Sequence, residues 1–210
     1  MPFESMGILI RIICLAGGYL VGCFQTAYII GRLAKNIDIR EHGSGNAGMT
    51  NMTRVLGAKY GMIVFVIDIF KAIIAYTTCW LIFDSVTAGL YAGLGVIFGH
   101  NFPIFLKFKG GKGIAASVGI IIMFDWKIAV IVFAIGLATL AITKYISLTS
   151  LLITGLFPFG TIAFGKEIEM IILCFTLAAL AFIMHRGNIK RLISGTERKF
   201  SLKSKGKLEE

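Results

Sequence analysis

Several short segments of the sequence combine polar side chains with glycines in patterns suited to binding an anion or moving a proton. The most distinctive is FKGGKGIAAS, residues 108–117, in which lysines flank two glycines and a third glycine precedes an apolar run. Glycines free the backbone, and the first turn of a following helix exposes unpaired N–H groups with partial positive charge. We therefore predict a phosphate site that comprises Lys109, Gly110, Gly111, Lys112 and Gly113.

This segment is not a Walker-type nucleotide loop, because Gly113 rather than Ser or Thr follows Gly111 and Lys112. ATP hydrolysis is therefore not expected. A loop that merely anchors the chain with positive charge would explain the lysines but not the paired glycines.

A second segment, HGSGNAGMTNMTR (residues 42–54), has hydroxyl and amide side chains among its glycines and ends in an arginine. Such a turn can form a nest of N–H groups for an anion. The alternative is a plain loop with helix-capping residues. The residues TNMTRVLG are expected to continue as a helix directly into the next apolar segment. The candidate phosphate ligands here are Ser44, Gly45, Asn46, Thr50, Asn51 and Arg54.

The third segment, HRGNIKRLISGTERK, leaves the last apolar stretch at His185. His185 and Asn188 are three positions apart, which places them on one face of a continuous helix. A basic tail beside anionic lipid headgroups would account for the cations but not for this imidazole and amide. Ser150, in YISLTS at the start of another apolar segment, is either a helix cap or a further member of the site.

Three further polar residues lie close to or within apolar segments. His100, in GHNFP, either caps a helix or belongs to the site. Asp68 and Lys71 are three residues apart within one segment, where two charges must pair with each other or face a polar interior. They are therefore either a structural pair or one wall of the site.

The remainder of the chain is far more apolar than a soluble domain. Of its 210 residues 57% are hydrophobic and 15% charged, with a mean hydropathy of +0.84, whereas a soluble domain has about a quarter charged residues. Apolar stretches long enough to cross a bilayer recur, without the alternation of a β-barrel. We predict an all-α integral membrane bundle of about seven spans, the fourth of them short, at residues 8–30, 60–82, 87–105, 113–125, 127–143, 149–165 and 168–185.

Small residues and cysteines fit this bundle. Gly89 and Gly93, and likewise Gly95 and Gly99, have the four-residue spacing that permits close helix packing. The four cysteines lie in apolar segments without CxxC spacing, so we interpret them as buried hydrophobic residues and expect no metal site.

Charge predicts the orientation. Of the 21 lysines and arginines, 17 fall in connections on one side of the predicted bundle or in the tail. By the positive-inside rule that side is cytoplasmic, with the N-terminus outside and the C-terminus inside. We predict a transmembrane catalytic domain at residues 1–185 and a cytoplasmic basic tail at residues 186–210, the first part of which contributes to the site.

Three motifs together resemble a known family. GSGNAGMTN, GHNFPIFLKFKGGKG and HRGNIKRLISGTE match, in kind and order, the loop motifs of the bacterial acyl-phosphate–glycerol-3-phosphate acyltransferases, the PlsY family. Ala47 stands where proline is common, Met49 where alanine is common, and Met184 where arginine often precedes the histidine. The resemblance covers residues 43–197, and the positions it implies to be functional are Ser44, Arg54, Lys112, Ser150, His185 and Asn188.

The resemblance implies a seven-span enzyme of the bacterial inner membrane whose active site faces the cytoplasm. Such an enzyme transfers a fatty acyl group from acyl phosphate to the 1-hydroxyl of glycerol 3-phosphate, and needs no cofactor. Its partners would be those two substrates and the phospholipid membrane, with no nucleic acid and no obligate protein partner. The HxxxxD motif of acyl-CoA-dependent enzymes is absent, because Ala47, Phe105 and Lys190 stand five residues after the three histidines.

The expected roles follow the chemistry of the two substrates. Lys112 and the glycine-loop N–H groups would stabilise one phosphate and the developing oxyanion, while Arg54 and the Ser44 loop would hold the other phosphate. His185, with Ser150 and Asn188, would orient the hydroxyl. Either His185 or the phosphate of the donor would accept the proton. The rival interpretations are a transporter of phosphate compounds and a non-catalytic lipid-binding scaffold.

Overall fold

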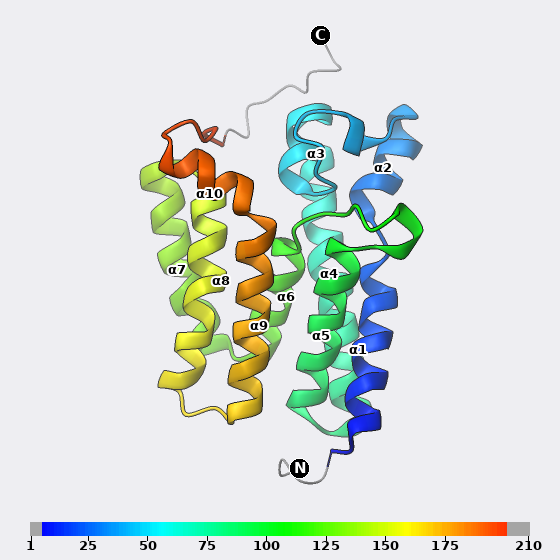
Figure 1. The fold of residues 1–210 in the computed structure, drawn as a ribbon, viewed down its shortest axis with the longest axis vertical. Coiled ribbons are helices and arrows are strands. Elements are labelled where there is room, and N and C mark those ends of the chain that lie inside the picture. Colours follow the sequence, from blue (N-terminus) through cyan, green and yellow to red (C-terminus); the bar gives the residue numbers. More distant parts are fainter. Residues whose placement is uncertain (1–5, 201–210) are drawn as a thin grey trace.

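The computed structural model describes residues 6–200, and all regular structure in this part of the chain is helical (Figure 1). Long helices run up and down the bundle, and short ones lie in the connections. In chain order they are α1 (Ile8–Gly22), α2 (Thr26–Lys35), η1 (Ile39–Glu41), α3 (Met49–Leu56), α4 (Ala58–Phe83), α5 (Val86–Asn101), η2 (Ile104–Leu106), α6 (Ile114–Phe124), α7 (Trp126–Thr143), α8 (Ile146–Ala163), α9 (Ile168–Met184) and α10 (Arg186–Ile193).

The predicted all-α membrane bundle is confirmed in its main features. Within residues 6–200, five helical segments are long and apolar enough to cross a bilayer, or six when α9 and the bent α10 are taken together. Helix α6 has only 11 residues, about half the length of a full crossing, so the predicted shortness of the fourth segment is correct. A count of seven crossings remains a prediction.

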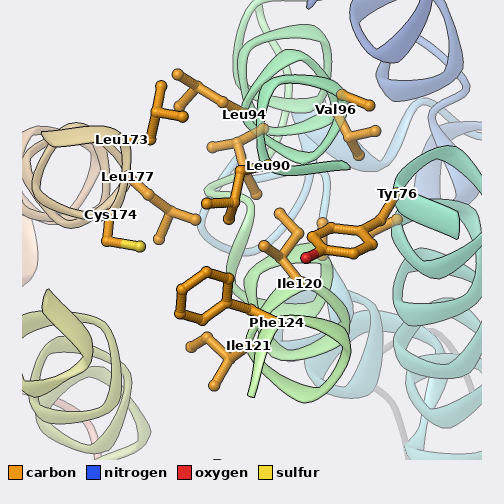
Figure 2. Close-up of a cluster of buried hydrophobic side chains, with 14 of the residues drawn as sticks. Tyr76, Leu90, Leu94, Val96, Ile120, Ile121, Phe124, Leu173, Cys174 and Leu177 are labelled. Atoms are coloured by element: carbon orange, nitrogen blue, oxygen red, sulfur yellow. The ribbon is translucent and has the colours of Figure 1, made fainter. Parts of the chain in front are cut away.

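The apolar core lies where α4, α5, α6 and α9 meet (Figure 2). Tyr76, Leu94, Ile120 and Leu177 project into it from these four helices. Phe124 extends the core toward α8 by an edge-to-face contact with Phe157, with ring centroids 5.5 Å apart. This core holds α6 against α4 and α5.

Helices α1 and α5 approach each other through glycines on both sides. A methyl carbon added at Gly18 or Gly22 would lie closer than 3.0 Å to a backbone oxygen of α5, and one added at Gly95 or Gly99 equally close to a backbone oxygen of α1. Only hydrogen fits in these positions, which allows the backbones to pack directly. The predicted packing role of Gly95 and Gly99 is therefore confirmed.

The polar connections gather toward one end of the bundle, here called the site end. Figure 1 shows α3, α10 and the turn between α7 and α8 there, with the loop between α5 and α6 somewhat below them. Helix α1 begins at the opposite end, where α4–α5, α6–α7 and α8–α9 are connected. The expected polar face thus exists, while the side of the membrane that it faces remains a prediction.

The opposite end is held by ion pairs. Arg11 of α1 donates from Nε to Glu169 Oε1 of α9 at 2.6 Å, and the Tyr91 hydroxyl of α5 donates to the same oxygen at 2.8 Å. Lys166 and Asp125 form a second ion pair at 2.7 Å. The contacts of Glu169 tie α1 and α5 to α9, and the Lys166–Asp125 pair ties the α8–α9 connection to the α6–α7 connection, at the end remote from the site.

Three helix boundaries differ from the predicted ones. The predicted first span is present as one apolar segment, Ile8–Lys35, but its helix is interrupted, because α1 ends at Gly22 and α2 starts at Thr26. The segment TNMTRVLG does not run into the next span, because Gly57 adopts a φ of 91° and separates α3 from α4. Helix α5 stops at Asn101 rather than at residue 105, two residues before Pro103, which cannot continue a helix.

The end of the last span also differs. Helices α9 and α10 meet at His185 with a bend of 63°, so His185 and Asn188 do not share a face of one continuous helix. The chain after α10 folds back, and the Phe200 N–H donates to the carbonyl of Lys144 at 2.8 Å. Residues 201–210 of the predicted basic tail lie outside the described part of the chain.

The α1–α5 contact offers a neighbouring pair of substitutions with opposite expected effects. Gly18→Ala should lower the free energy of unfolding by about 1–3 kcal/mol, because its methyl group would overlap the backbone of α5. The control is Gly17→Ala on the same helix, where an added carbon meets nothing within 4 Å. The control should be neutral or stabilising, since alanine favours a helix by roughly 0.5–1 kcal/mol over glycine. Unfolding in detergent measures both, and equal effects would contradict this packing.

Candidate active site

The two predicted phosphate loops lie side by side at the site end. Arg40 Nη1 donates to the carbonyl oxygens of Leu106 at 2.9 Å and Lys109 at 3.3 Å, which ties the first loop to the α5–α6 hairpin. The loops also pack directly, because a carbon added at Gly111 would lie 2.7 Å from the Ala47 carbonyl oxygen. The two loops that the sequence predicts to bind anions therefore lie together in one region.

The glycine loop is seated on the end of α5. The Gly111 N–H donates to the His100 carbonyl at 3.0 Å, and the Gly110 N–H donates to the Asn101 carbonyl at 3.2 Å. Gly113 is the N-cap of α6 with a φ of 76°, a conformation that favours glycine. The N–H groups of the first turn of α6 have no helical acceptor and are free to bind an anion. Lys109 is exposed, whereas Lys112 is partly buried.

Lys112 begins a chain of hydrogen bonds that links three elements. Its ammonium donates to Asn188 Oδ1 of α10. Asn188 Nδ2 in turn donates to Glu197 Oε1 at 2.6 Å, and this oxygen also accepts from the Ser147 hydroxyl of α8 at 2.9 Å. Arg191 Nε donates to the other carboxylate oxygen of Glu197 at 2.6 Å. The structure thus brings Lys112 and Asn188, two predicted site residues, into direct contact.

Charges around this cluster shift its pKa values. Burial lowers the pKa of Lys112 to about 8; the Glu197 carboxylate opposes the shift, while the positive charges of Arg191 and Arg54 add to it. Burial would raise the pKa of Glu197, but the hydrogen bonds from Asn188, Ser147 and Arg191 outweigh it and lower the pKa below its usual range. Glu197 is therefore ionised and supports the ammonium form of Lys112.

Arg54 belongs to the same electrostatic environment. Burial lowers the pKa of its guanidinium, with a further lowering by Arg198 and Arg191 and an opposing effect of Glu197. Arg54 lies in the last turn of α3, which follows the first loop in the chain. The predicted ligands from the first and second segments therefore share one charged region.

His185 sits at the bend between α9 and α10 and is buried. Its Nδ1 lies 2.7 Å from the Ala181 carbonyl oxygen. Because a carbonyl only accepts, Nδ1 carries the proton and Nε2 is left with a lone pair. The residue lies within electrostatic range of Lys112, so its free nitrogen is a basic group near the cluster.

Ser150 is not a helix cap, because α8 begins at Ile146. Its hydroxyl donates to the Ile146 carbonyl at 2.8 Å, inside the helix. Ser147, three residues earlier on the same face, is the serine that contacts Glu197. A catalytic role for Ser150 remains a prediction.

Asn51 builds the first loop with the polar atoms of its side chain. Its Oδ1 accepts from the Ser44 N–H at 2.7 Å, and its Nδ2 donates to the carbonyls of Ile39 at 3.0 Å and His42 at 2.9 Å. Asn51 is buried by this role, while Ser44 and Gly45 are exposed and Asn46 and Thr50 are partly buried. Asn51, which the sequence predicts as a phosphate ligand, thus holds the backbone of the loop that carries Ser44.

Sequence reasoning missed Ser147, Glu197 and Arg191. Glu197 has one available signal, since it is an isolated acidic residue in a basic segment. Asn101 was also not predicted as a site residue. It is buried, with an exposed fraction of 1%, and neither polar atom of its side-chain amide has a hydrogen-bond partner in the described residues. Its Oδ1 lies beside Gly113, because it would be 3.0 Å from a carbon added there. The possible members Asp68, Lys71 and His100 form a separate buried network beneath the glycine loop.

The fold and the site define a helical membrane protein with a cluster of cations and hydrogen-bond donors at one end of its bundle. Residues 12–195 match the family model described as glycerol-3-phosphate acyltransferase, and the chain belongs to this family. This match confirms the family resemblance carried by the three motifs.

Individual relatives agree over most of the chain. It is 44% identical over 186 residues to a glycerol-3-phosphate acyltransferase of Thermoanaerobacter sp. (strain X514), covering 89% of this chain and 93% of the relative. It is 40% identical over 181 residues to the glycerol-3-phosphate acyltransferase of Bacillus subtilis (strain 168), covering 86% and 93%.

Solved structures show the same fold. The chain is similar to the crystal structure of PlsY (YgiH), an integral membrane glycerol 3-phosphate acyltransferase, in its glycerol 3-phosphate form, with a TM-score of 0.84 and 31% identity. The lysophosphatidic acid form of that protein gives a TM-score of 0.81. Each likeness covers 91% of this chain and 96% of the other.

The charge balance around Lys112 predicts the effect of removing its carboxylate. Glu197→Gln should lower the pKa of Lys112 further below about 8, because the negative charge that favours the ammonium is gone. The rate of amine labelling at Lys112, followed against pH by mass spectrometry, should then rise at a lower pH than in the unaltered protein. Glu167→Gln, at the exposed N-cap of α9, is the control and should leave the curve in place. A curve that moves to higher pH would contradict this arrangement.

Proposed function

We propose that this chain transfers a fatty acyl group from acyl phosphate to the 1-hydroxyl of glycerol 3-phosphate. The products are lysophosphatidate and inorganic phosphate. Membership of the glycerol-3-phosphate acyltransferase family supports the acceptor. The observation that carries the proposal is the chain of hydrogen bonds from Lys112 through Asn188 to Glu197, beside a helix N-terminus and Arg54.

Two phosphorylated substrates need two anion-binding groups close together. Lys112, the glycine loop and the first turn of α6 form one, and Arg54 with the loop that carries Ser44 forms the other. The packing of Gly111 against Ala47 supports this assignment, because it brings the two loops close enough to serve one reaction. Each phosphate would be held by charge and by backbone N–H groups, the donor set that suits it.

The reaction then requires little further chemistry from the protein. The hydroxyl oxygen bonds to the acyl carbon, and the bond between that carbon and the phosphate oxygen breaks. Phosphate leaves readily, so no strong general acid is needed. The ammonium of Lys112 and the N–H groups of the glycine loop stabilise the negative charge that develops on the carbonyl oxygen.

The hydroxyl proton has two available acceptors. One is Nε2 of His185, whose lone pair is free because Nδ1 is bonded to the Ala181 carbonyl. The other is the phosphate of the donor, with a second pKa near 6. Ser150, on α8 one turn after Ile146, would help to orient the hydroxyl.

We further propose that the chain crosses a bacterial inner membrane seven times, counting the short α6, with its site end in the cytoplasm. The support is the bias of charge, because 17 of 21 cations fall in the connections and tail on that side. Soluble glycerol 3-phosphate would then enter from the cytoplasm. The acyl chain of the other substrate would remain beside lipid.

The donor is tested with purified protein in detergent. We expect turnover of glycerol 3-phosphate with palmitoyl phosphate and none with palmitoyl-CoA, measured by release of phosphate and by mass spectrometry of the product. Turnover in detergent also distinguishes an enzyme from a transporter, which needs two compartments. Efficient use of the CoA thioester would overturn the proposed donor.

Lys112 is tested by removing its charge. Lys112→Met should reduce kcat by about 10²–10³-fold, because a preorganised donor to the developing charge is lost. Lys109→Met on the same loop is the matched control: its side chain is exposed, so the expected loss is much smaller. If the Lys112→Met protein keeps full activity while folded, the proposed role of this residue is wrong.

A further inference from the structure

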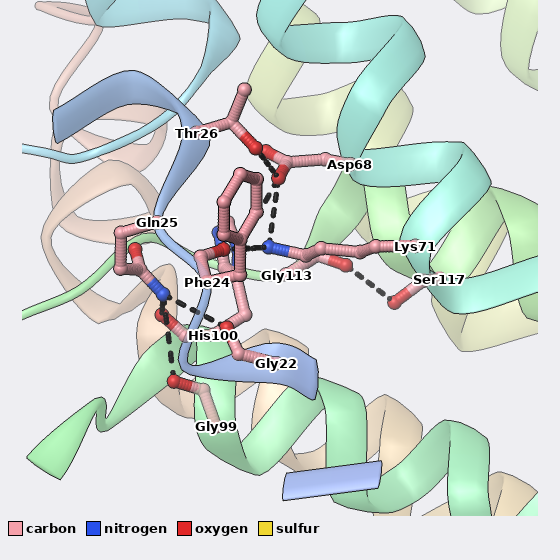
Figure 3. A network of polar contacts seen from close by, with 10 residues as sticks. All are labelled: Gly22, Phe24, Gln25, Thr26, Asp68, Lys71, Gly99, His100, Gly113 and Ser117. Atoms are coloured by element: carbon pink, nitrogen blue, oxygen red, sulfur yellow. Dashed lines mark hydrogen bonds and ion pairs between the residues drawn. The ribbon is translucent and has the colours of Figure 1, made fainter. Parts of the chain in front are cut away.

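A network of buried ionisable side chains lies directly beneath the glycine loop of the proposed active site (Figure 3). It consists of Asp68 and Lys71 on α4 and His100 on α5, with exposed fractions of 1%, 6% and 3%. Ionisable side chains within a membrane-spanning region are costly and are usually retained for a function. The contacts of these three residues indicate what that function is.

Lys71 uses all three of its N–H donors. Its Nζ lies 2.8 Å from Asp68 Oδ1, 2.8 Å from the Phe24 carbonyl oxygen and 2.9 Å from His100 Nδ1. Because the ammonium can only donate, Nδ1 of His100 accepts and the ring proton resides on Nε2. Lys71 therefore fixes both the tautomer and the orientation of the His100 ring.

The break in the first span is part of the same network. Phe24 lies between α1 and α2, where its carbonyl can turn toward Lys71. The flanking residues are also bound: the Thr26 hydroxyl donates to Asp68 Oδ1 at 2.8 Å, and Gln25 Nε2 donates to the His100 carbonyl at 3.1 Å. The network thus holds His100 from its ring and from its backbone.

His100 in turn sets the position of the glycine loop. Its carbonyl accepts from the Gly111 N–H at 3.0 Å. Its ring lies directly behind Gly111, because a carbon added there would be closer than 3.0 Å to His100 Nε2. Gly111 is therefore confined between the fixed imidazole and the first loop at Ala47, and Lys112 is the next residue.

We propose that Lys71, with Asp68 and His100, positions the glycine loop and thereby holds the ammonium of Lys112 against Asn188. The three are positioning residues, since they act through Gly111 and have no direct contact with the cluster at Glu197. The proposal rests on the proposed function of Lys112. A buried ion pair adds little net stability compared with apolar residues of similar volume, so stability alone does not account for this one.

The test removes both charges together, so that no unpaired charge is left in the bundle. The double variant Asp68→Leu/Lys71→Met should remain folded, with a thermal midpoint in detergent close to that of the unaltered protein. Its kcat with palmitoyl phosphate should nevertheless fall about 10- to 100-fold, because an ångström-scale misplacement of a catalytic group has effects of this size. Glu169→Gln, which breaks the ionic cluster at the opposite end, is the control and should retain its kcat.

Two further readouts separate positioning from a general structural effect. Hydrogen exchange should become faster in residues 107–117 of the double variant but not of the control, because the Gly110 and Gly111 amides lose their fixed acceptors. In a Lys112→Met background the same double substitution should reduce kcat less than twofold, since residues that act through one another are not additive.

Hydrogen exchange in residues 107–117 that is the same in the double variant as in the unaltered protein would overturn the proposal. So would a full 10- to 100-fold loss of kcat when the double substitution is made in the Lys112→Met background. The exchange measurement needs no substrate. If the unaltered protein fails to use palmitoyl phosphate, the proposed donor is wrong, and the positioning of the loop is still decided by exchange.

Discussion

Charged side chains inside a bundle of this kind need partners within the protein, and this constraint organises the contacts between its helices. Three polar layers satisfy it at three depths. Arg11 and Glu169 join α1 to α9 at one end, Asp68, Lys71 and His100 lie further along, and Lys112, Asn188 and Glu197 form the layer at the site end. Between them the helices contact one another through apolar side chains and glycines.

The last of these layers joins parts of the chain that are distant in sequence. Lys112 precedes α6, Asn188 belongs to α10, and Glu197 lies in the segment that folds back after it. Without Asn188, Lys112 would lose the acceptor of its ammonium, and among the described residues Glu197 would keep only the donors Ser147 and Arg191. The site and the closure of the bundle at this end therefore depend on the same hydrogen bonds, and a substrate phosphate would enter a region already rich in donors.

The loop between α5 and α6 shows why short helices are useful here. Because α5 stops at Asn101 and α6 begins only at Ile114, the backbone between them lies outside both α-helices and contains only the short 3-10 turn η2 below the site end. Irregular backbone at such a depth is tolerated where protein covers it. The ends of α5 and the loop of Ala47 provide this cover, and glycines at positions 110 and 111 permit the close approach.

Family membership and the contacts at the site end are independent observations that support each other. The family model and the PlsY structures identify the kind of protein from similarity over nearly the whole chain. The contact of Lys112 with Asn188 and the packing of Gly111 against Ala47 explain in physical terms why the three motifs lie together. Apolar segments far apart in sequence fold so that three loops meet at one end.

The sequence by itself determined the helical membrane bundle, the short fourth segment, the close packing at Gly95 and Gly99, and the polar end. These features follow from apolar runs, residue size and charge, which are local properties of the chain. Only the tertiary structure decided which polar groups become partners. It broke the first span so that Phe24 meets Lys71, bent the chain at His185, and chose Ser147 rather than Ser150 for Glu197. The physical reason is that a hydrogen bond depends on distance and direction between atoms of different helices, and no single segment carries that information.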